Sequence, residues 1–325
     1  MSVAGKPVHG RNGASRVALA AAVSIAWMVC SSALILVNKH ILVGLKFPFP
    51  MTVSALGMAA SSICSYLACR VLRIVEANAS VSPGFWVKHM LPIGFMMAMT
   101  LWTGNLVYLY LSVSFIQMLK AFTPVITMLA LFMVGLEKPN SPMIFSVLII
   151  AAGTAASAYG EATLNAAGIF FMFASEITEA ARLVATQYLL VGAGGLQLSP
   201  IEGVMYLSPA CVFWLGLGAM FLEFPSIRAA GVAGVPAANG RLFFVAAMLG
   251  FCINMLAYMT IQLASSLTLK GGGGVLATVK NALIIVAAMA IWGEVVTGLQ
   301  AVGYLASAAA FVLYTVLKMR QVAAG

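Results

Sequence analysis

The sequence predicts an all-α membrane protein with ten transmembrane helices. Of its 325 residues, 62% are hydrophobic and only 8% are charged, and the mean hydropathy is +1.05. Soluble domains carry about 25% charged residues, so this composition excludes a soluble fold. The apolar segments are continuous rather than alternating with polar residues, which excludes an outer-membrane barrel.

Ten apolar segments have about the length that a helix needs to cross a bilayer, roughly 20 residues. They lie at residues 17–39, 51–72, 88–111, 114–135, 143–160, 165–191, 201–222, 242–266, 274–292 and 296–318. Very short connections, such as Leu111–Val113, require antiparallel neighbours. Residues 1–16 and 319–325 are predicted to be tails that flank a single helical domain at 17–318.

The distribution of basic residues predicts the orientation in the membrane. An even number of spans places both termini on one side, and most Lys and Arg residues fall on that side. Only Lys46, Arg228 and Arg241 fall on the other. The positive-inside rule therefore places both termini in the cytosol. It also accounts for the net charge of +9 without a nucleic-acid partner. The first apolar segment is too long for a signal peptide and is taken as an uncleaved span.

Two lysines, Lys120 and Lys280, lie inside apolar segments. A charge at bilayer depth costs about 3 kcal/mol or more, so such a residue usually faces a partner or a watery cavity. Two buried cations predict a pathway for an anionic molecule. The alternative is a structural ion pair with Glu176, Glu179 or Arg182 of the sixth segment. Glu179 and Arg182 lie three residues apart on one helix face, so they are expected to pair with each other.

The positions of the lysines also suggest an internal repeat of residues 17–160 and 165–318. Lys120 lies 17 residues before Glu137, and Lys280 lies 14 residues before Glu294. The difference is close to one helical turn, so both lysines are expected at similar depths on similar faces. A repeat of five spans runs in the opposite orientation. Inverted repeats are typical of secondary transporters, whose site lies near the midplane between the halves.

Two further features are open to more than one interpretation. Lys39 ends the first segment, where it can contact a substrate from the lumenal side or extend to the lipid headgroups. Gly271–Gly274 precedes the ninth segment and is expected to be a flexible cytosolic link or a gate hinge. It lacks the Lys-Ser/Thr of a nucleotide-binding loop. No metal-ligand spacing or nucleophile–base pair occurs, so we expect neither an enzyme nor a cofactor.

Several motifs together resemble those of a known family. They are Asn38-Lys39 with Phe47-Pro48-Phe49-Pro50, residues 115–121 (FIQMLKA), Tyr159-Gly160-Glu161, residues 179–184 (EAARLV), residues 265–270 (SSLTLK) and Val279-Lys280-Asn281. Over about residues 17–318 the chain resembles the triose-phosphate translocator and nucleotide-sugar transporter family of the drug/metabolite transporter superfamily. The resemblance implies a ten-helix antiporter that exchanges a phosphorylated metabolite by alternating access. It also implies that Lys280 meets the substrate phosphate and that Lys120 is a second family lysine.

The chain departs from the family pattern at positions that bear on the substrate. Asn281 stands where the plastid phosphate translocators have Arg, and it can hydrogen-bond a sugar or base but adds no charge. Only Phe251 and Asn254 match the Phe-Tyr-Asn-Asn motif of guanosine-diphosphate-mannose transporters, which disfavours a guanosine substrate. The pattern is closer to the plant and algal branch that includes uridine-diphosphate-sugar transporters. The glycines at 271–274 interrupt the family pattern, and a shift in helix register there would turn Lys280 away.

We therefore predict an antiporter that exchanges a nucleotide sugar for a nucleoside monophosphate across a Golgi or ER membrane. Lys120 and Lys280 would hold phosphate through charge-assisted hydrogen bonds. The other candidate substrate-binding residues are Asn254, Tyr258, Asn281, Lys39 and Gln117. The expected partners are this anion, its counter-substrate and the lipid bilayer. A homodimer is one assembly that the sequence leaves open.

Two other functions remain open from the sequence. One is a plastid-envelope exchanger of sugar phosphate for phosphate. Two features disfavour this plastid exchanger. They are Asn281 in place of Arg and the lack of a recognisable transit segment. The other is a proton-coupled exporter of organic solutes that uses Glu161, Glu176 or Glu179. Tolerance of a Lys280→Ala substitution would favour that exporter.

Overall fold

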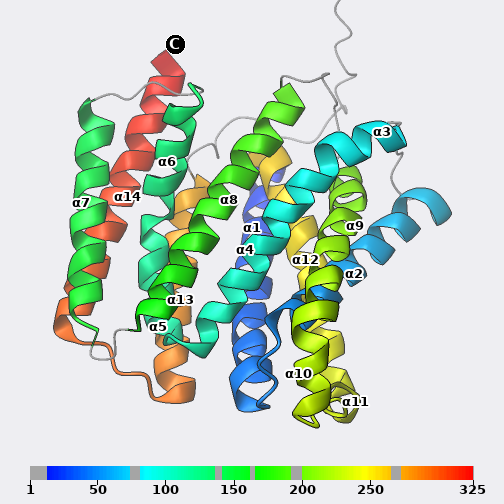
Figure 1. Ribbon diagram of the computed structural model, residues 1–325. Coiled ribbons are helices and arrows are strands. Elements are labelled where there is room, and N and C mark those ends of the chain that lie inside the picture. The colour runs from blue at the N-terminus through cyan, green and yellow to red at the C-terminus, as the bar shows by residue number, and fades with distance from the viewer. Residues whose placement is uncertain are drawn as a thin grey trace, which may run out of the picture.

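The computed structural model describes residues 13–73, 81–135, 141–161, 165–191, 200–264 and 272–324. Within these ranges the regular structure is helical (Figure 1). The helices are α1 (Gly13–Lys39), α2 (Pro50–Tyr66), α3 (Pro83–Phe85), α4 (Leu91–Leu106), α5 (Val113–Leu119), α6 (Thr123–Met133), α7 (Ser141–Tyr159), α8 (Ala166–Val191), α9 (Pro200–Gly218), α10 (Phe224–Ala229), α11 (Val235–Ala238), α12 (Gly240–Ala264), α13 (Gly272–Trp292) and α14 (Gly298–Ala324). Short 3₁₀ or π-helical turns extend or join several of them.

Eight helical segments among the described residues are long and apolar enough to cross a membrane. They are Ala18–Gly44, Pro50–Val71, Pro83–Leu109, Val113–Met133, Ser141–Tyr159, Ile201–Ala229, Gly240–Ala257 and Gly298–Leu317. All ten segments predicted from the sequence are helical. However, α8 carries three charged residues, and the apolar helix recognised in α13 is the shorter Ala277–Trp292. An all-helical membrane protein is thus confirmed, whereas the count of ten spans stays a prediction.

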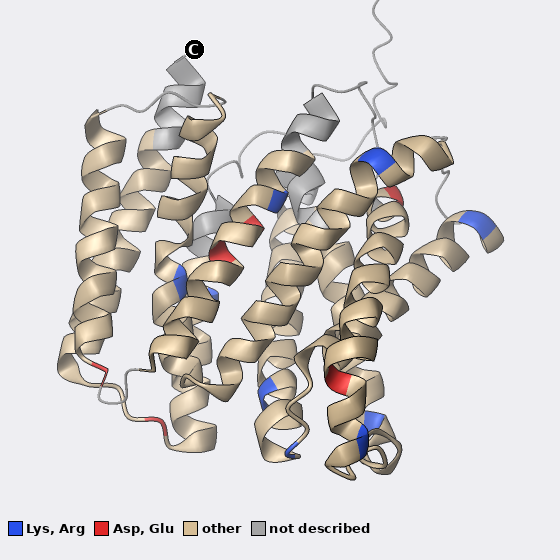
Figure 2. Cartoon of the chain, in the orientation of Figure 1, with Lys and Arg blue, Asp and Glu red and all other residues tan. Residues whose placement is uncertain are grey.

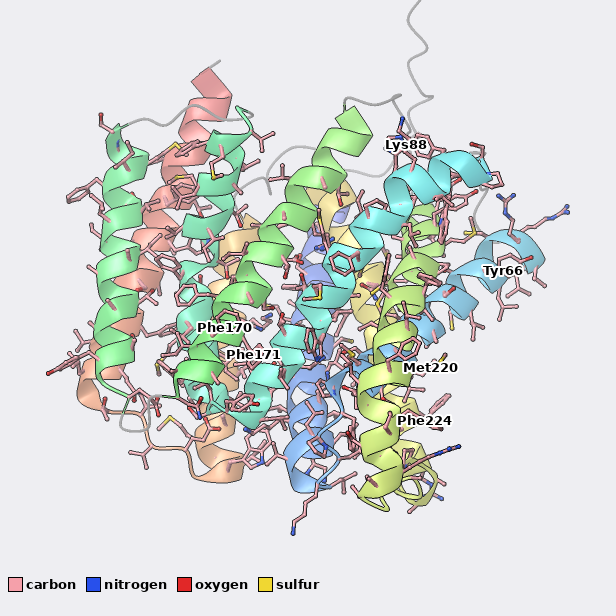
Figure 3. The ribbon with its side chains drawn as sticks, in the orientation of Figure 1. Tyr66, Lys88, Phe170, Phe171, Met220 and Phe224 are labelled. Carbon is pink, nitrogen blue, oxygen red and sulfur yellow. The ribbon has the colours of Figure 1, made fainter. Side chains whose placement is uncertain are left out.

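The outer surface of the bundle is apolar, as contact with lipid requires. Figure 3 shows the side chains of Phe170, Met220 and Phe224 at the surface of α8, the turn after α9, and α10. Each of the three is more than two-fifths exposed. Exposed large apolar side chains on these helices are unfavourable in water but favourable against acyl chains, which supports a multi-pass integral membrane protein.

The helix contacts follow a regular pattern across the two halves of the chain. α1 packs on α12, and α8 packs on α4. In the same way α2 packs on α12 and α9 on α4, while α1 packs on α13 and α8 on α6. Three further pairs, α7 with α14, α2 with α9 and α5 with α13, join the halves directly. In this pattern α1 corresponds to α8, α2 to α9, α4 to α12, α5 and α6 to α13, and α7 to α14. Each contact made by a helix of one half is therefore matched by a contact of the corresponding helix of the other half.

α7 and α14 approach so closely that their backbones touch. A Cβ atom added to Gly153 would lie 2.6 Å from the Gly303 carbonyl oxygen, and one added to Gly303 would lie 2.7 Å from the Ser157 amide nitrogen. Ser307 donates to the Ile150 carbonyl at 3.1 Å. Each helix places two small residues four positions apart at the contact, which allows the backbones to approach closely. They are Gly153 and Ser157 on α7 and Gly303 and Ser307 on α14.

Gly153→Leu is therefore expected to lower the stability of the protein by about 1–3 kcal/mol, because a side chain cannot enter this contact without separating the helices. The measurement is the thermal unfolding midpoint of the purified protein in detergent. Gly216→Leu is the matched control, because a Cβ there meets no atom within 4 Å. Equal midpoints for the two variants would contradict this account of the α7–α14 contact.

An apolar plug closes the end of the bundle where α1 and α4 finish and α5 begins, at the bottom of Figure 1. We define the plug by six side chains that are each at most 1% exposed. They are Ile41, Leu42, Phe47, Val107, Val113 and Phe115. These residues belong to one core cluster that also includes Ile284 and Ala288 of α13. This end of the bundle is therefore filled by tightly packed apolar side chains from both halves of the chain.

Two charged side chains secure the backbone at the plug. The Glu294 carboxylate accepts hydrogen bonds from the amides of Val113 at 2.8 Å and Ser114 at 2.7 Å, at the start of α5. The Lys39 Nζ atom donates to the carbonyls of Tyr108 at 2.7 Å and of Leu111 at 3.3 Å. The Glu294 carboxylate thus binds the N-terminus of α5, where the helix dipole is positive. The Lys39 ammonium binds backbone carbonyls that follow the end of α4 and have no helical partner.

Candidate functional site: two buried lysines at one cavity

Lys280 is buried on α13, with 8% of its side chain exposed. Its Nζ atom donates to Ser31 Oγ at 3.2 Å and lies 4.8 Å from the centre of the Trp27 ring. Trp27 and Ser31 are four residues apart and share one face of α1. No carboxylate lies within 4 Å of Lys280 Nζ in the described part of the chain. Its charge is thus met by an aromatic face and a hydroxyl group rather than by a counter-ion.

Lys120 lies where the fourth predicted span departs from a continuous α-helix. The chain runs from α5 through a 3₁₀ turn at Lys120–Phe122 into α6. Pro124 explains the break, because it has no N–H to donate to the carbonyl four residues earlier, which is that of Lys120. The Thr123 hydroxyl donates to this carbonyl instead, at 2.7 Å. Lys120 therefore lies at a short 3₁₀ turn between α5 and α6, within the predicted segment 114–135, which is one helical segment, Val113–Met133, in the structure.

Both lysines line a single cavity of about 340 Å³. Its walls come from α6 with the preceding 3₁₀ turn, α13 and α14. Hydroxyl and amide groups in the walls belong to Thr123, Thr127, Thr278, Asn281, Tyr304 and Tyr314, and the remainder is largely apolar. Figure 2 shows that most of the length of the described helices is tan, without Lys, Arg, Asp or Glu, and that α8 carries both red and blue segments. A largely apolar cavity with a few polar groups and two cations has the chemistry of a site for an organic anion.

Gln117 lies on α5, one turn before Lys120, and is completely buried. Neither its amide nitrogen nor its amide oxygen has a hydrogen-bond partner among the described residues. Buried polar groups are nearly always paired, so both atoms remain available for a partner beside Lys120. Gln117 does not line the cavity in this structure.

Asn254 belongs to a second, smaller cavity of about 110 Å³ between α1, α2, α4 and α12. Its amide donates to Ser61 Oγ at 3.0 Å. In the same cavity Asn38 donates to Asn105 at 3.1 Å, and Asn105 donates to Ser54 at 2.8 Å. The structure therefore separates Asn254 from the lysine cavity.

The remaining candidates divide into three cases. Asn281 lines the lysine cavity. Lys39 secures the plug instead of lining either cavity. Tyr258 is on α12, but its side chain lies outside the described residues, as do Glu137, Lys270 and Gly271. Gly272–Gly274 form the first residues of α13, and Lys280 still faces the cavity.

The sequence interpretation missed several residues that shape the site. Trp27 and Ser31 contact Lys280 from α1, and Tyr304 reaches the cavity from α14. No pattern in the sequence marks them, since a Trp or Ser in an apolar helix is usually a packing residue. Thr123 could have been found, because a Thr-Pro pair that begins three residues after Lys120 signals a break in the helix.

The predicted pairing within the sixth segment is confirmed. Arg182 Nε donates to Glu179 at 2.8 Å, and its Nη2 makes a second contact with the same carboxylate. This pair is thus satisfied within α8.

The fold and the site together define a multi-pass integral membrane protein with a cationic cavity in its interior. The sequence matches the profile of the Triose-phosphate Transporter family over residues 18–315. The chain belongs to this family, as the motifs around Lys39, Lys120 and Lys280 predicted.

Relatives of this chain carry two kinds of name. The "Probable sugar phosphate/phosphate translocator At3g17430" of Arabidopsis thaliana is 31% identical over 92% of this chain and 78% of its own length. A second protein of the same description, At4g32390, is 32% identical over 86% of this chain and 77% of its own length. "UDP-galactose transporter 1" from the same plant is 26% identical over 82% of this chain and 76% of its own length. These names describe translocators and transporters rather than enzymes.

Proposed function

We propose that the protein is an antiporter that exchanges a phosphorylated sugar, free or linked to a nucleotide, for a second phosphate compound. The observation that carries this proposal is that Lys120 and Lys280, from different halves of the chain, line one cavity. Phosphate oxygens accept charge-assisted hydrogen bonds from ammonium groups. Substrate phosphate would take the place of Ser31 and the Trp27 ring as the partner of the Lys280 ammonium.

Transport would follow from alternating access between two inverted halves. The helix pairs that are exchanged when the halves are exchanged, such as α1–α12 and α8–α4, support this repeat. An inverted repeat can adopt a second conformation in which the two halves trade their packing roles. The apolar plug closes one end in this structure, so the second conformation must open the plug and close the opposite end.

Two substrates are candidates. A nucleotide sugar, exchanged for a nucleoside monophosphate, is supported by Asn281 and by the likeness to a UDP-galactose transporter. The amide-lined cavity at Asn254 adds hydrogen-bonding groups away from the lysines. A sugar phosphate, exchanged for inorganic phosphate, is supported by the names of the more similar relatives and by a lysine cavity of about 340 Å³. A Golgi or ER membrane with both termini in the cytosol suits the first, and a plastid envelope suits the second.

Uptake into proteoliposomes tests this proposal and distinguishes the two substrates. Vesicles that contain the purified protein are loaded with inorganic phosphate, UMP, GMP, CMP or AMP. They are then offered labelled sugar phosphates and nucleotide sugars. Stimulation by internal phosphate alone identifies a sugar-phosphate exchanger, and stimulation by one nucleoside monophosphate identifies a nucleotide-sugar exchanger and its base. Uptake that depends on a proton gradient and on no internal phosphate compound would contradict the proposal.

A further inference from the structure

Glu176 is a buried carboxylate beside the lysine cavity. It lies on α8, which packs against α6, and its side chain is 7% exposed. Its neighbours are the Thr123 hydroxyl and the Lys120 ammonium, and both of these residues line the cavity. Its Oε2 atom has no hydrogen-bond partner in the described part of the chain. Burial of an ionised carboxylate is strongly unfavourable unless a cation compensates it, and Lys120 is the cation that acts on Glu176. The two side chains interact across more than 4 Å, since the ion pair found among the described residues is Glu179–Arg182.

Lys120 has two charged neighbours, because Glu176 attracts its ammonium group and Lys280 repels it. Glu179, one turn further along α8, is already paired with Arg182. Lys280 lies close enough to Lys120 for the two ammonium groups to repel each other. With both lysines protonated and Glu176 ionised, the three side chains carry a net charge of +1.

We propose that Glu176 is the exchangeable counter-ion of Lys120. While the cavity is empty, the Glu176 carboxylate compensates the positive charge of the Lys120 ammonium. When a substrate phosphate binds, the phosphate replaces Glu176 as the partner of Lys120. This inference rests on the proposed function, because it assigns a role to Glu176 in the same exchange. Glu176 is a residue that tunes the charge of the site and does not itself hold the substrate.

Two consequences follow from the charges. A cavity with two uncompensated cations is unfavourable in a medium of low dielectric constant, so an empty carrier reorients more readily when Glu176 is ionised. Glu176 therefore permits some uncoupled transport. It also competes with the substrate for Lys120, so it weakens the binding of phosphate dianions.

Glu176→Gln removes the charge and keeps the size of the side chain. The variant is expected to raise the ratio of exchange to uncoupled efflux by about tenfold or more, the effect of losing one charge interaction in a partly buried site. It is also expected to lower the KM for a phosphate dianion. A purely structural role for Glu176 would lower the rates of exchange and efflux together and leave their ratio unchanged.

The experiment uses proteoliposomes loaded with labelled inorganic phosphate and, in parallel, with labelled UMP. Efflux is measured with and without a phosphate compound outside. Glu202→Gln is the matched control, since Glu202 is a buried glutamate on α9 that does not line the lysine cavity, and its ratio should equal that of the wild type. Glu176→Asp retains the charge and should also keep a ratio near the wild-type value.

The outcomes separate the inference from the function on which it rests. The inference is supported if the ratio of exchange to uncoupled efflux rises in Glu176→Gln and not in Glu176→Asp or Glu202→Gln. An unchanged or lower ratio, with exchange still present, overturns it and leaves the proposed function intact. If Glu176→Gln does not fold, a ratio in Glu176→Asp that falls outside the wild-type range overturns the inference instead. Wild-type vesicles that exchange neither phosphate nor UMP overturn the proposed function itself.

Discussion

Lys280→Ala is expected to reduce exchange about 10- to 100-fold while the protein remains folded. The substrate phosphate would lose one of its two cationic partners inside a low-dielectric cavity. A hydrogen bond to a charged group contributes about 1.5–3 kcal/mol, and each 1.4 kcal/mol corresponds to a factor of ten. Stability should not fall, because the substitution removes a buried cation without a paired carboxylate and leaves no opposite charge unpaired.

The measurements for Lys280→Ala are trans-stimulated uptake and the thermal unfolding midpoint, made on the same preparation. Lys88→Ala is the control, because Lys88, labelled in Figure 3, is an exposed cation that does not line the cavity. Its uptake should match that of the wild type. Exchange that survives in Lys280→Ala would refute the lysine site and favour the proton-coupled exporter.

Glu294→Gln is expected to favour the conformation in which the plug is open. In the closed plug the Glu294 carboxylate accepts two backbone hydrogen bonds at the start of α5. A neutral amide accepts them more weakly and does not complement the positive end of the helix. A loss of about 2 kcal/mol in the closed state shifts the equilibrium about 30-fold toward opening.

The shift at the plug can be followed by the rate at which a membrane-impermeant maleimide modifies a Val113→Cys variant. Val113 is completely buried in the closed plug, so modification reports opening. Combining Val113→Cys with Glu294→Gln should accelerate modification. Glu161→Gln serves as the control, because the Glu161 carboxylate accepts a hydrogen bond from Gln300 of α14 at 2.7 Å. Equal rates in the presence and absence of Glu294→Gln would show that the carboxylate does not hold the plug shut.

Features that depend on local sequence were predictable. Runs of apolar residues long enough to span a bilayer became helices, because a helix satisfies every backbone group within lipid. Spacing along one helix predicted the Glu179–Arg182 pair. Charges inside apolar segments drew attention to Lys120 and Lys280, which line one cavity. Their role in binding a substrate stays a prediction.

Features that depend on how helices are rotated against each other were not predictable. The contact of Lys280 with Trp27 and Ser31 requires the relative rotation of α13 and α1, which no single segment specifies. Lys39 gave no sign that it would bind carbonyls of a different helix end. Asn254 was assigned to the lysine site because it lies on a matching helix, but it faces a separate cavity.

The central claim is that Lys120 and Lys280 bind one phosphate group together. The most direct test is equilibrium binding of the labelled substrate to purified wild type, to Lys120→Ala, to Lys280→Ala and to the double variant. We predict that each single variant loses most of the affinity, that the double variant loses little more, and that the dephosphorylated substrate binds none of the four. Independent, additive losses, or wild-type affinity in either single variant, would contradict a shared phosphate site.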